Sequence, residues 1–92
     1  MDNSTPDRLP DGHWLGTVVP KRLAKRAVTR NLVKRQMREA LRRHAAGLPH
    51  GLWLMKLRAG FDRREFPSAA SDALRACVRA ELDHLLARAA QR

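Results

Sequence analysis

The sequence is poor in cysteine and has no long apolar run. Cys77 is the only cysteine, so no disulfide can form within the chain and no cysteine-based zinc site can be assembled. No run approaches the roughly 18 apolar residues of a membrane span, and from the polar, acidic residues 1–12 we expect no secretory signal. We therefore expect a cytoplasmic protein without a membrane partner, which agrees with the scarcity of cysteine.

The residue types that carry catalysis or hold metals do not form a recognisable arrangement. The histidines fall in different segments and lack the spacing of metal ligands; they are His13, His44, His50 and His84. The carboxylates form no evident pair for acid–base work, and no glycine-rich loop that would cradle a phosphate is present. We expect no catalytic residue, no metal site and no cofactor on this chain.

Acidic residues are also scarce, whereas basic residues are abundant. The 92 residues include 9 acidic and 19 basic side chains, which gives a formal net charge of +10. Such a balance points to a polyanionic partner, with nucleic acid ahead of an anionic membrane surface. The length suits one small domain. Turn-forming residues dominate positions 1–12, which we expect to be a flexible tail, and residues 13–92 then form a single RNA-binding domain.

The apolar pattern predicts strand, helix, strand and helix in that order. The first strand covers residues 13–19, and a helix follows from about Ala24 or Ala27 to about Ala46. A second strand spans residues 52–57. The final helix of about 20 residues begins after a cap at Ser68 or Ser71, and a loop over residues 59–66 precedes it. This order predicts two parallel strands and an α/β (α+β) fold, with a β-α-β-α core in which a basic helix packs on a small sheet.

Two strands and two helices make a thin fold. Both faces of each predicted strand carry apolar residues, and helices packed on one face leave the other exposed. Three explanations remain open: the chain self-associates through this uncovered sheet, it needs its RNA, or it lacks elements that a longer version has.

The basic stretch from Lys21 to Arg43 is the strongest functional signal. Glu39 is its only acidic residue. On a helical wheel the basic arc lies beside an apolar arc that contains Val33, Met37, Ala40, Leu41 and His44. We predict that phosphate contacts come from ten residues of this stretch: Lys21, Arg22, Lys25, Arg26, Arg30, Asn31, Lys34, Arg35, Arg38 and Arg42. A merely solvated charged face is the alternative.

The two tryptophans have two interpretations as well. Trp14 and Trp53 offer flat faces on which bases can stack, but both lie in predicted strands, where packing into the core is the favoured expectation.

At these residues the chain resembles the bacterial ribonuclease P protein component. The motif RN-x-x-KR-x-x-RE runs from Arg30 to Glu39, and it follows the strand pattern LG-x-VV and the basic pair Lys21 and Arg22. The resemblance covers about residues 13–90. It implies a fold similar to the second domain of ribosomal protein S5, with a left-handed βαβ crossover.

The resemblance also implies a function. The family's ribonucleoprotein removes the 5′ leader from precursor tRNA, with catalysis by the RNA subunit and magnesium. The implied partners are ribonuclease P RNA, bound through the basic helix, and precursor tRNA, whose leader lies in a cleft beside the sheet.

Two departures from the family pattern qualify these expectations. Leu32 stands where the motif has a further arginine. We also expect the family's N-terminal helix and first strands to be absent from this chain. Residues 1–12 resemble a loop between strands of a longer protein, so an internal start, a truncated product and a short natural variant are all open. The alternative functions are a ribosomal or chaperone-like RNA-binding protein and a truncated subunit that docks RNA without supporting leader binding. A helix-turn-helix is disfavoured because a strand separates the two helices.

Overall fold

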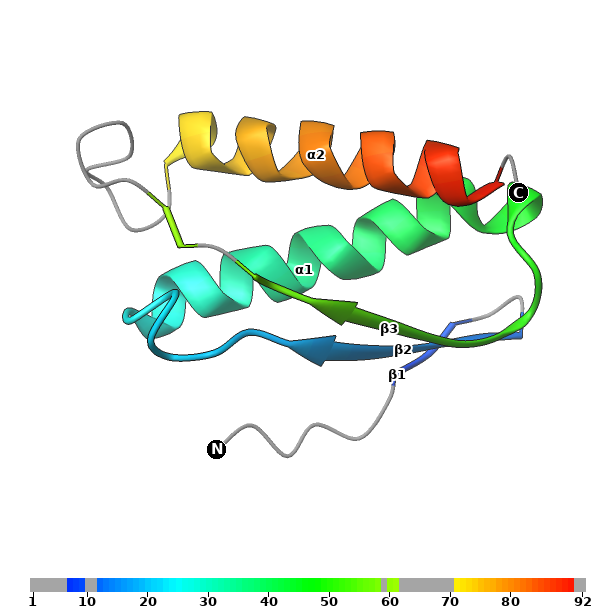
Figure 1. The fold of residues 1–92 in the computed structure, drawn as a ribbon, viewed down its shortest axis with the longest axis horizontal. Helices are drawn as coiled ribbons and strands as arrows, with labels where there is room; N and C mark the ends of the chain where they lie inside the picture. The colour runs from blue at the N-terminus through cyan, green and yellow to red at the C-terminus, as the bar shows by residue number, and fades with distance from the viewer. Residues whose placement is uncertain (1–6, 10–11, 59, 62–70, 91–92) are drawn as a thin grey trace.

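The computed structural model describes residues 7–9, 12–58, 60–61 and 71–90. They form a three-stranded sheet with both helices on one side of it (Figure 1). The strands are β1 (Asp7–Arg8), β2 (His13–Val18) and β3 (Gly51–Lys56), and the helices are α1 (Ala27–His44) and α2 (Asp72–Ala90). A short 3-10 helix, η1 (Ala45–Gly47), follows α1. The predicted element order is confirmed. The predicted loop over 59–66 and Ser68 lie outside the described residues, except for Gly60 and Phe61.

The sheet has the order β1-β2-β3, and the predicted parallel pairing is confirmed. β2 and β3 run parallel with Leu15 opposite Trp53, and α1 forms the connection between them. In Figure 1 both helices run opposite to these two strands, and α2 lies alongside α1. This is the arrangement expected when each strand is followed by a helix that packs back on the same face of the sheet.

β1 corrects the expectation of a flexible tail over residues 1–12. Asp7 and Arg8 pair antiparallel with β2, and the Leu9 amide donates a 2.8 Å hydrogen bond to the His13 carbonyl. Leu9 is only 2% exposed. The turn-forming composition of this segment therefore marks the bend into β2, and Leu9 is held by its burial. The remaining residues of the expected tail, 1–6 and 10–11, lie outside the described residues.

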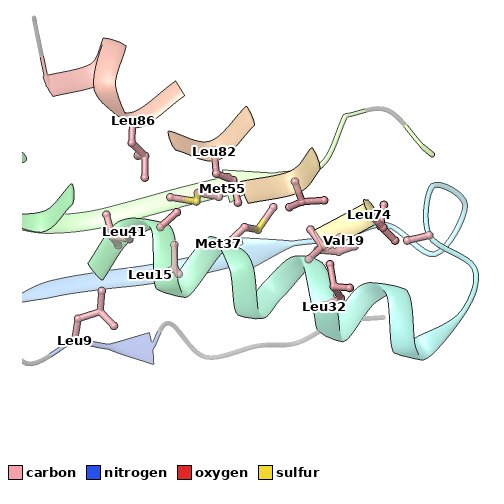
Figure 2. Packing of buried hydrophobic residues seen from close by; sticks show 14 of the residues in the cluster. Leu9, Leu15, Val19, Leu32, Met37, Leu41, Met55, Leu74, Leu82 and Leu86 are labelled. Carbon is pink, nitrogen blue, oxygen red and sulfur yellow. The ribbon is translucent and has the colours of Figure 1, made fainter. Parts of the chain in front are cut away.

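The core lies between the sheet and the two helices (Figure 2). Leu15 of β2, Met55 of β3 and Val19, directly after β2, contribute to it. α1 contributes the predicted apolar arc, of which Val33, Met37, Ala40 and Leu41 are buried and His44 is half-buried. Because the apolar side chains of α1 recur at helical spacing, one stripe of this helix meets both the sheet and α2.

α2 buries a stripe that differs by one position from the predicted one. Leu74, Val78 and Leu82 are buried as expected, but the stripe continues through Leu86, whereas Leu85 is 56% exposed. A spacing of four residues keeps Leu86 on the face of Leu82. Ser71 is confirmed as a cap: its Oγ accepts a 3.0 Å hydrogen bond from the Leu74 amide, the third residue of the helix.

The far face of the sheet is uncovered in the described part of the chain. Trp14 is 42% exposed, Val18 37%, Leu52 64% and Leu54 71%. The favoured expectation that Trp14 packs in the core is therefore wrong, since its ring lies on this face, where the Arg8 guanidinium sits 5.9 Å from the ring centroid. Trp53 points to the opposite face, is half-buried and packs against the core. We call the surface of Trp14, Val18, Leu52 and Leu54 the open sheet face.

Candidate nucleic-acid interface

The connection between β2 and α1 carries the first four predicted site residues. Lys21, Arg22, Lys25 and Arg26 are all exposed. The connection is anchored at its middle, because the amides of Leu23 and Ala24 both donate hydrogen bonds to the Pro20 carbonyl and Ala24 is buried. The four cations are therefore displayed on a turn whose backbone is held against the core.

Arg30 ties this connection to α1. Its Nη1 donates hydrogen bonds of 3.0 Å to the Ala24 carbonyl and 2.8 Å to the Lys25 carbonyl. The N–H groups on Nη1 are thereby committed to the protein backbone, although a guanidinium has five donors in total. The structure shows that Arg30 fixes the backbone beside the neighbouring cations, whereas its expected contact with RNA stays a prediction.

The remaining predicted residues form a band along one side of α1. Arg35, Arg38 and Arg42 are exposed, as is Asn31, and Lys34 is half-buried. Leu32, which replaces an arginine of the motif, is 9% exposed and belongs to the core, so its replacement leaves the band intact. The band adjoins the buried stripe, as the helical wheel predicts. We call these five residues and the four cations of the connection the cationic band.

A hollow opens between the cationic band and the start of α2. Its volume is about 240 Å³, and its lining combines apolar, amide and guanidinium groups: Val28, Asn31, Leu32, Arg35, Gln36 and Arg75. We call it the α1/α2 hollow. Sequence reasoning missed Gln36 and Arg75. A glutamine within the apolar stripe of α1 was the available signal for Gln36, whereas Arg75 enters only through the packing of α2 on α1.

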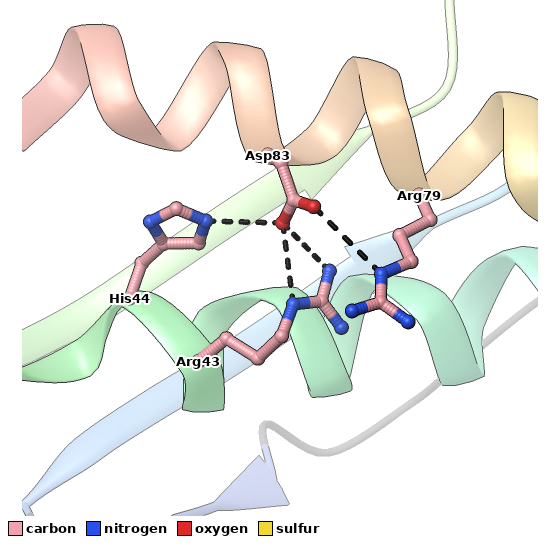
Figure 3. Close-up of polar contacts among 4 residues, drawn as sticks. All are labelled: Arg43, His44, Arg79 and Asp83. Carbon is pink, nitrogen blue, oxygen red and sulfur yellow. Dashed lines mark hydrogen bonds and ion pairs between the residues drawn. The ribbon is translucent and has the colours of Figure 1, made fainter.

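In the last turn of α1, the basic residues Arg43 and His44 bind a carboxylate of α2 (Figure 3). Arg43 donates hydrogen bonds of 3.2 Å from Nε and 2.7 Å from Nη2 to Asp83 on α2, and His44 Nε2 lies 3.0 Å from the same carboxylate oxygen. Arg79 Nε is 3.8 Å from the other oxygen. Arg43 is thus directed towards α2, while Arg42 beside it belongs to the cationic band.

Asp83 is held in its ionised form by these neighbours. The hydrogen bond from Arg43 is the largest cause that lowers the pKa of Asp83 from its ordinary value of 3.8; partial burial opposes it, and the bond from His44 and the charges of both groups add to it. The cluster is a link between the helices.

The histidines are not gathered into a metal site. His13 is fully buried, its Nε2 lies 3.1 Å from the Leu48 carbonyl, and its ring meets that of His50 edge-on. Among the residues that the structure describes, no cluster of His, Cys, Asp or Glu side chains could hold a metal ion.

Neither helix, as far as it is described, has the length and apolar character needed to cross a membrane.

A small α/β domain with a cationic helix beside an exposed sheet has the form of a nucleic-acid-binding module. The family model for Ribonuclease P matches residues 3–89. The chain therefore belongs to the ribonuclease P protein family.

Curated relatives agree with this assignment. The chain is 49% identical over 77 residues to the ribonuclease P protein component of Burkholderia pseudomallei, covering 84% of this chain and 57% of the relative. It is 47% identical to that of Paraburkholderia xenovorans, covering 84% of this chain and 55% of the relative. The chain thus spans little more than half the length of these relatives. No solved structure shows significant similarity to it.

Proposed function

We propose that this chain acts as a protein subunit of ribonuclease P and aids removal of the 5′ leader from precursor tRNA. The observation that carries the proposal is the cationic band on a helix that carries the family motif, in a chain that the family model matches almost from end to end. Its partners would be ribonuclease P RNA and precursor tRNA, and it would work in the cytoplasm. Catalysis belongs to the RNA subunit with magnesium, and the chain supplies RNA-binding groups.

The binding mechanism that we propose is neutralisation of RNA phosphates. The contacts come from Lys21, Arg22, Lys25, Arg26, Arg30, Asn31, Lys34, Arg35, Arg38 and Arg42. Arginine predominates, and its planar fork matches phosphate oxygens. Each neutralised phosphate releases counterions, so the affinity should fall steeply as the salt concentration rises.

For the fold we propose the left-handed βαβ crossover of the family, from β2 through α1 to β3. Family membership and the parallel pairing of β2 with β3 support it. It would be an exception to the rule that such crossovers are right-handed.

The decisive experiment is cleavage of a precursor tRNA by ribonuclease P RNA from a close relative, at low magnesium, with and without this chain. Stimulation of cleavage supports the proposal. A variant in which Lys34, Arg38 and Arg42 are all replaced by Gln should stimulate much less, because it can no longer neutralise the phosphates that these side chains meet. If the chain neither stimulates cleavage nor binds that RNA in a salt-sensitive way, the assignment is refuted. The chain would then be a generic basic RNA-binding protein.

A second candidate is a subunit that docks on the RNA without presenting the leader. It is favoured by the open sheet face. Tight, salt-sensitive binding without stimulation of cleavage would identify this form.

The open sheet face also supports our further proposal that the chain self-associates through it.

A further inference from the structure

We propose that the α1/α2 hollow holds one unpaired nucleotide of the bound RNA, with the phosphate between Arg35 and Arg75 and the base against Gln36 and Leu32. This inference rests on the proposed function, and it adds α2 to an interface that the sequence places on α1 and the connection before it. It also assigns a role to Gln36 and Arg75.

The hollow has the size of a single base. Its volume of about 240 Å³ equals the share of roughly eight water molecules in the liquid, which is too little for a paired helix to enter. The apolar walls, Val28 and Leu32, suit the flat faces of a base. Sequence-specific recognition of RNA generally uses unpaired nucleotides whose bases are turned out and bound by their edges.

Gln36 supplies the polar group that a base edge would meet. Its side chain lines the hollow, and the residue is only 4% exposed. A carboxamide that lines the hollow is placed to bond to water or to a ligand that enters it. A carboxamide offers both a donor and an acceptor, which is the pattern that the edges of bases also present.

The guanidinium groups at the rim supply the charge that a phosphate needs. Arg35 lines the hollow from α1, is exposed and forms no ion pair with a described residue. Arg75 lines it from α2 and forms an ion pair with Asp72, three residues before it in the same helix. The Asp72 side chain is 98% exposed, so this ion pair is solvated and weak. A phosphate between two arginines, with bidentate hydrogen bonds, can replace it.

The test compares Arg75→Gln with Arg88→Gln. Both changes remove one positive charge from α2, but Arg88 lies in its last turn, about 20 Å along the helix from Arg75. A third variant, Gln36→Met, removes the carboxamide at nearly constant volume. Affinity for ribonuclease P RNA is measured together with the dimethyl sulfate reactivity of its unpaired bases.

The expected result is one unpaired adenine or cytosine that the wild-type chain protects and that Arg75→Gln and Gln36→Met leave reactive. Affinity should fall about tenfold with Arg75→Gln and less than threefold with Arg88→Gln, because only Arg75 makes a charge-assisted contact at the hollow. Arg75 is half exposed, so Arg75→Gln should fold. If Gln36→Met does not fold, the comparison of Arg75→Gln with Arg88→Gln is still a complete test.

Two other results have separate meanings. If the wild-type chain does not bind the RNA, the proposed function fails and this site fails with it. If the wild type binds, but both arginine variants weaken binding equally and the protection pattern is unchanged, the hollow holds no nucleotide and the proposed function still stands.

Discussion

At the scale of single residues, arginines that are close in the chain do different work. Arg42 is exposed in the cationic band, whereas Arg43 is bonded to Asp83 and joins the two helices. Arg30 uses its Nη1 group to hold the carbonyls of Ala24 and Lys25. The direction that each side chain takes from α1 decides whether it faces solvent, a carboxylate or the backbone.

Arg38→Ala tests the phosphate assignment within the cationic band. Because phosphate contacts carry no sequence information, binding should weaken by a similar factor for RNAs of unrelated sequence. The slope of log K against log salt should become shallower by about 0.7–0.9, since the variant neutralises one phosphate fewer. Fluorescence anisotropy across a salt series measures both, with Arg88→Ala as the control. Weakening confined to one RNA sequence would contradict the assignment.

Asp83→Asn tests the link between the helices. Asp83 is partly exposed, so its ion pairs should contribute only about 0.5–1 kcal/mol to the free energy of unfolding. Its pKa is lowered in the folded state, so the contribution is present at neutral pH and is lost as the pH falls from about 4 through the folded-state value.

Urea unfolding of wild type and Asp83→Asn at pH 7 and pH 3 measures this contribution. The difference between the two proteins should shrink at the lower pH. Glu81→Gln on the exposed side of α2 is the control and should change stability little at either pH. An undiminished difference at pH 3 would mean that charge is not the source of the effect.

At the scale of the elements, each helix is defined by the face that it buries. α1 has a continuous buried stripe with the cationic band beside it, so one element serves both the core and the interface. α2 packs against α1. It brings Arg75, near its start, to the α1/α2 hollow, and Asp83, in its second half, to the last turn of α1. The hollow exists because α2 passes alongside α1 at Leu32 and Gln36.

Leu86→Ala and Leu85→Ala form a matched pair on α2. Leu86 is 2% exposed and Leu85 is 56% exposed. Truncation of Leu86 should lower the free energy of unfolding by about 2–5 kcal/mol, since it leaves a cavity against α1. Truncation of Leu85 should cost less than about 0.5 kcal/mol. Denaturant unfolding of the two variants measures the difference, and equal destabilisation would show that the buried face of α2 is assigned wrongly.

At the scale of the whole molecule, the open sheet face is the dominant feature. Helices cover one face of the sheet, while Trp14, Val18, Leu52 and Leu54 remain exposed on the other. Contiguous apolar surface of this kind usually marks an interaction site. Our proposal that a second copy binds there can be tested without RNA.

Leu54→Lys should reduce self-association without lowering stability. Leu54 is 71% exposed in the single chain, so a lysine costs little there but opposes burial against a second copy. Analytical ultracentrifugation over a range of concentrations measures the association. Leu85→Lys, at an exposed leucine on α2, should behave like the wild type. A wild-type chain that stays monomeric throughout would rule out the proposed dimer.

The order of the elements, the parallel strand pair, the buried stripe of α1 and the family motif were predictable from the sequence. Each follows from spacing along the chain: a period of 3.6 or 2 residues assigns side chains to faces before any tertiary contact exists. Only the tertiary structure decided that Trp14 is exposed, that Leu86 rather than Leu85 is buried, and that residues 7–9 join the sheet. It alone brought Arg75 to Gln36 and Arg35. These outcomes depend on groups far apart in the sequence, and periodicity within one segment does not specify which segment packs against it.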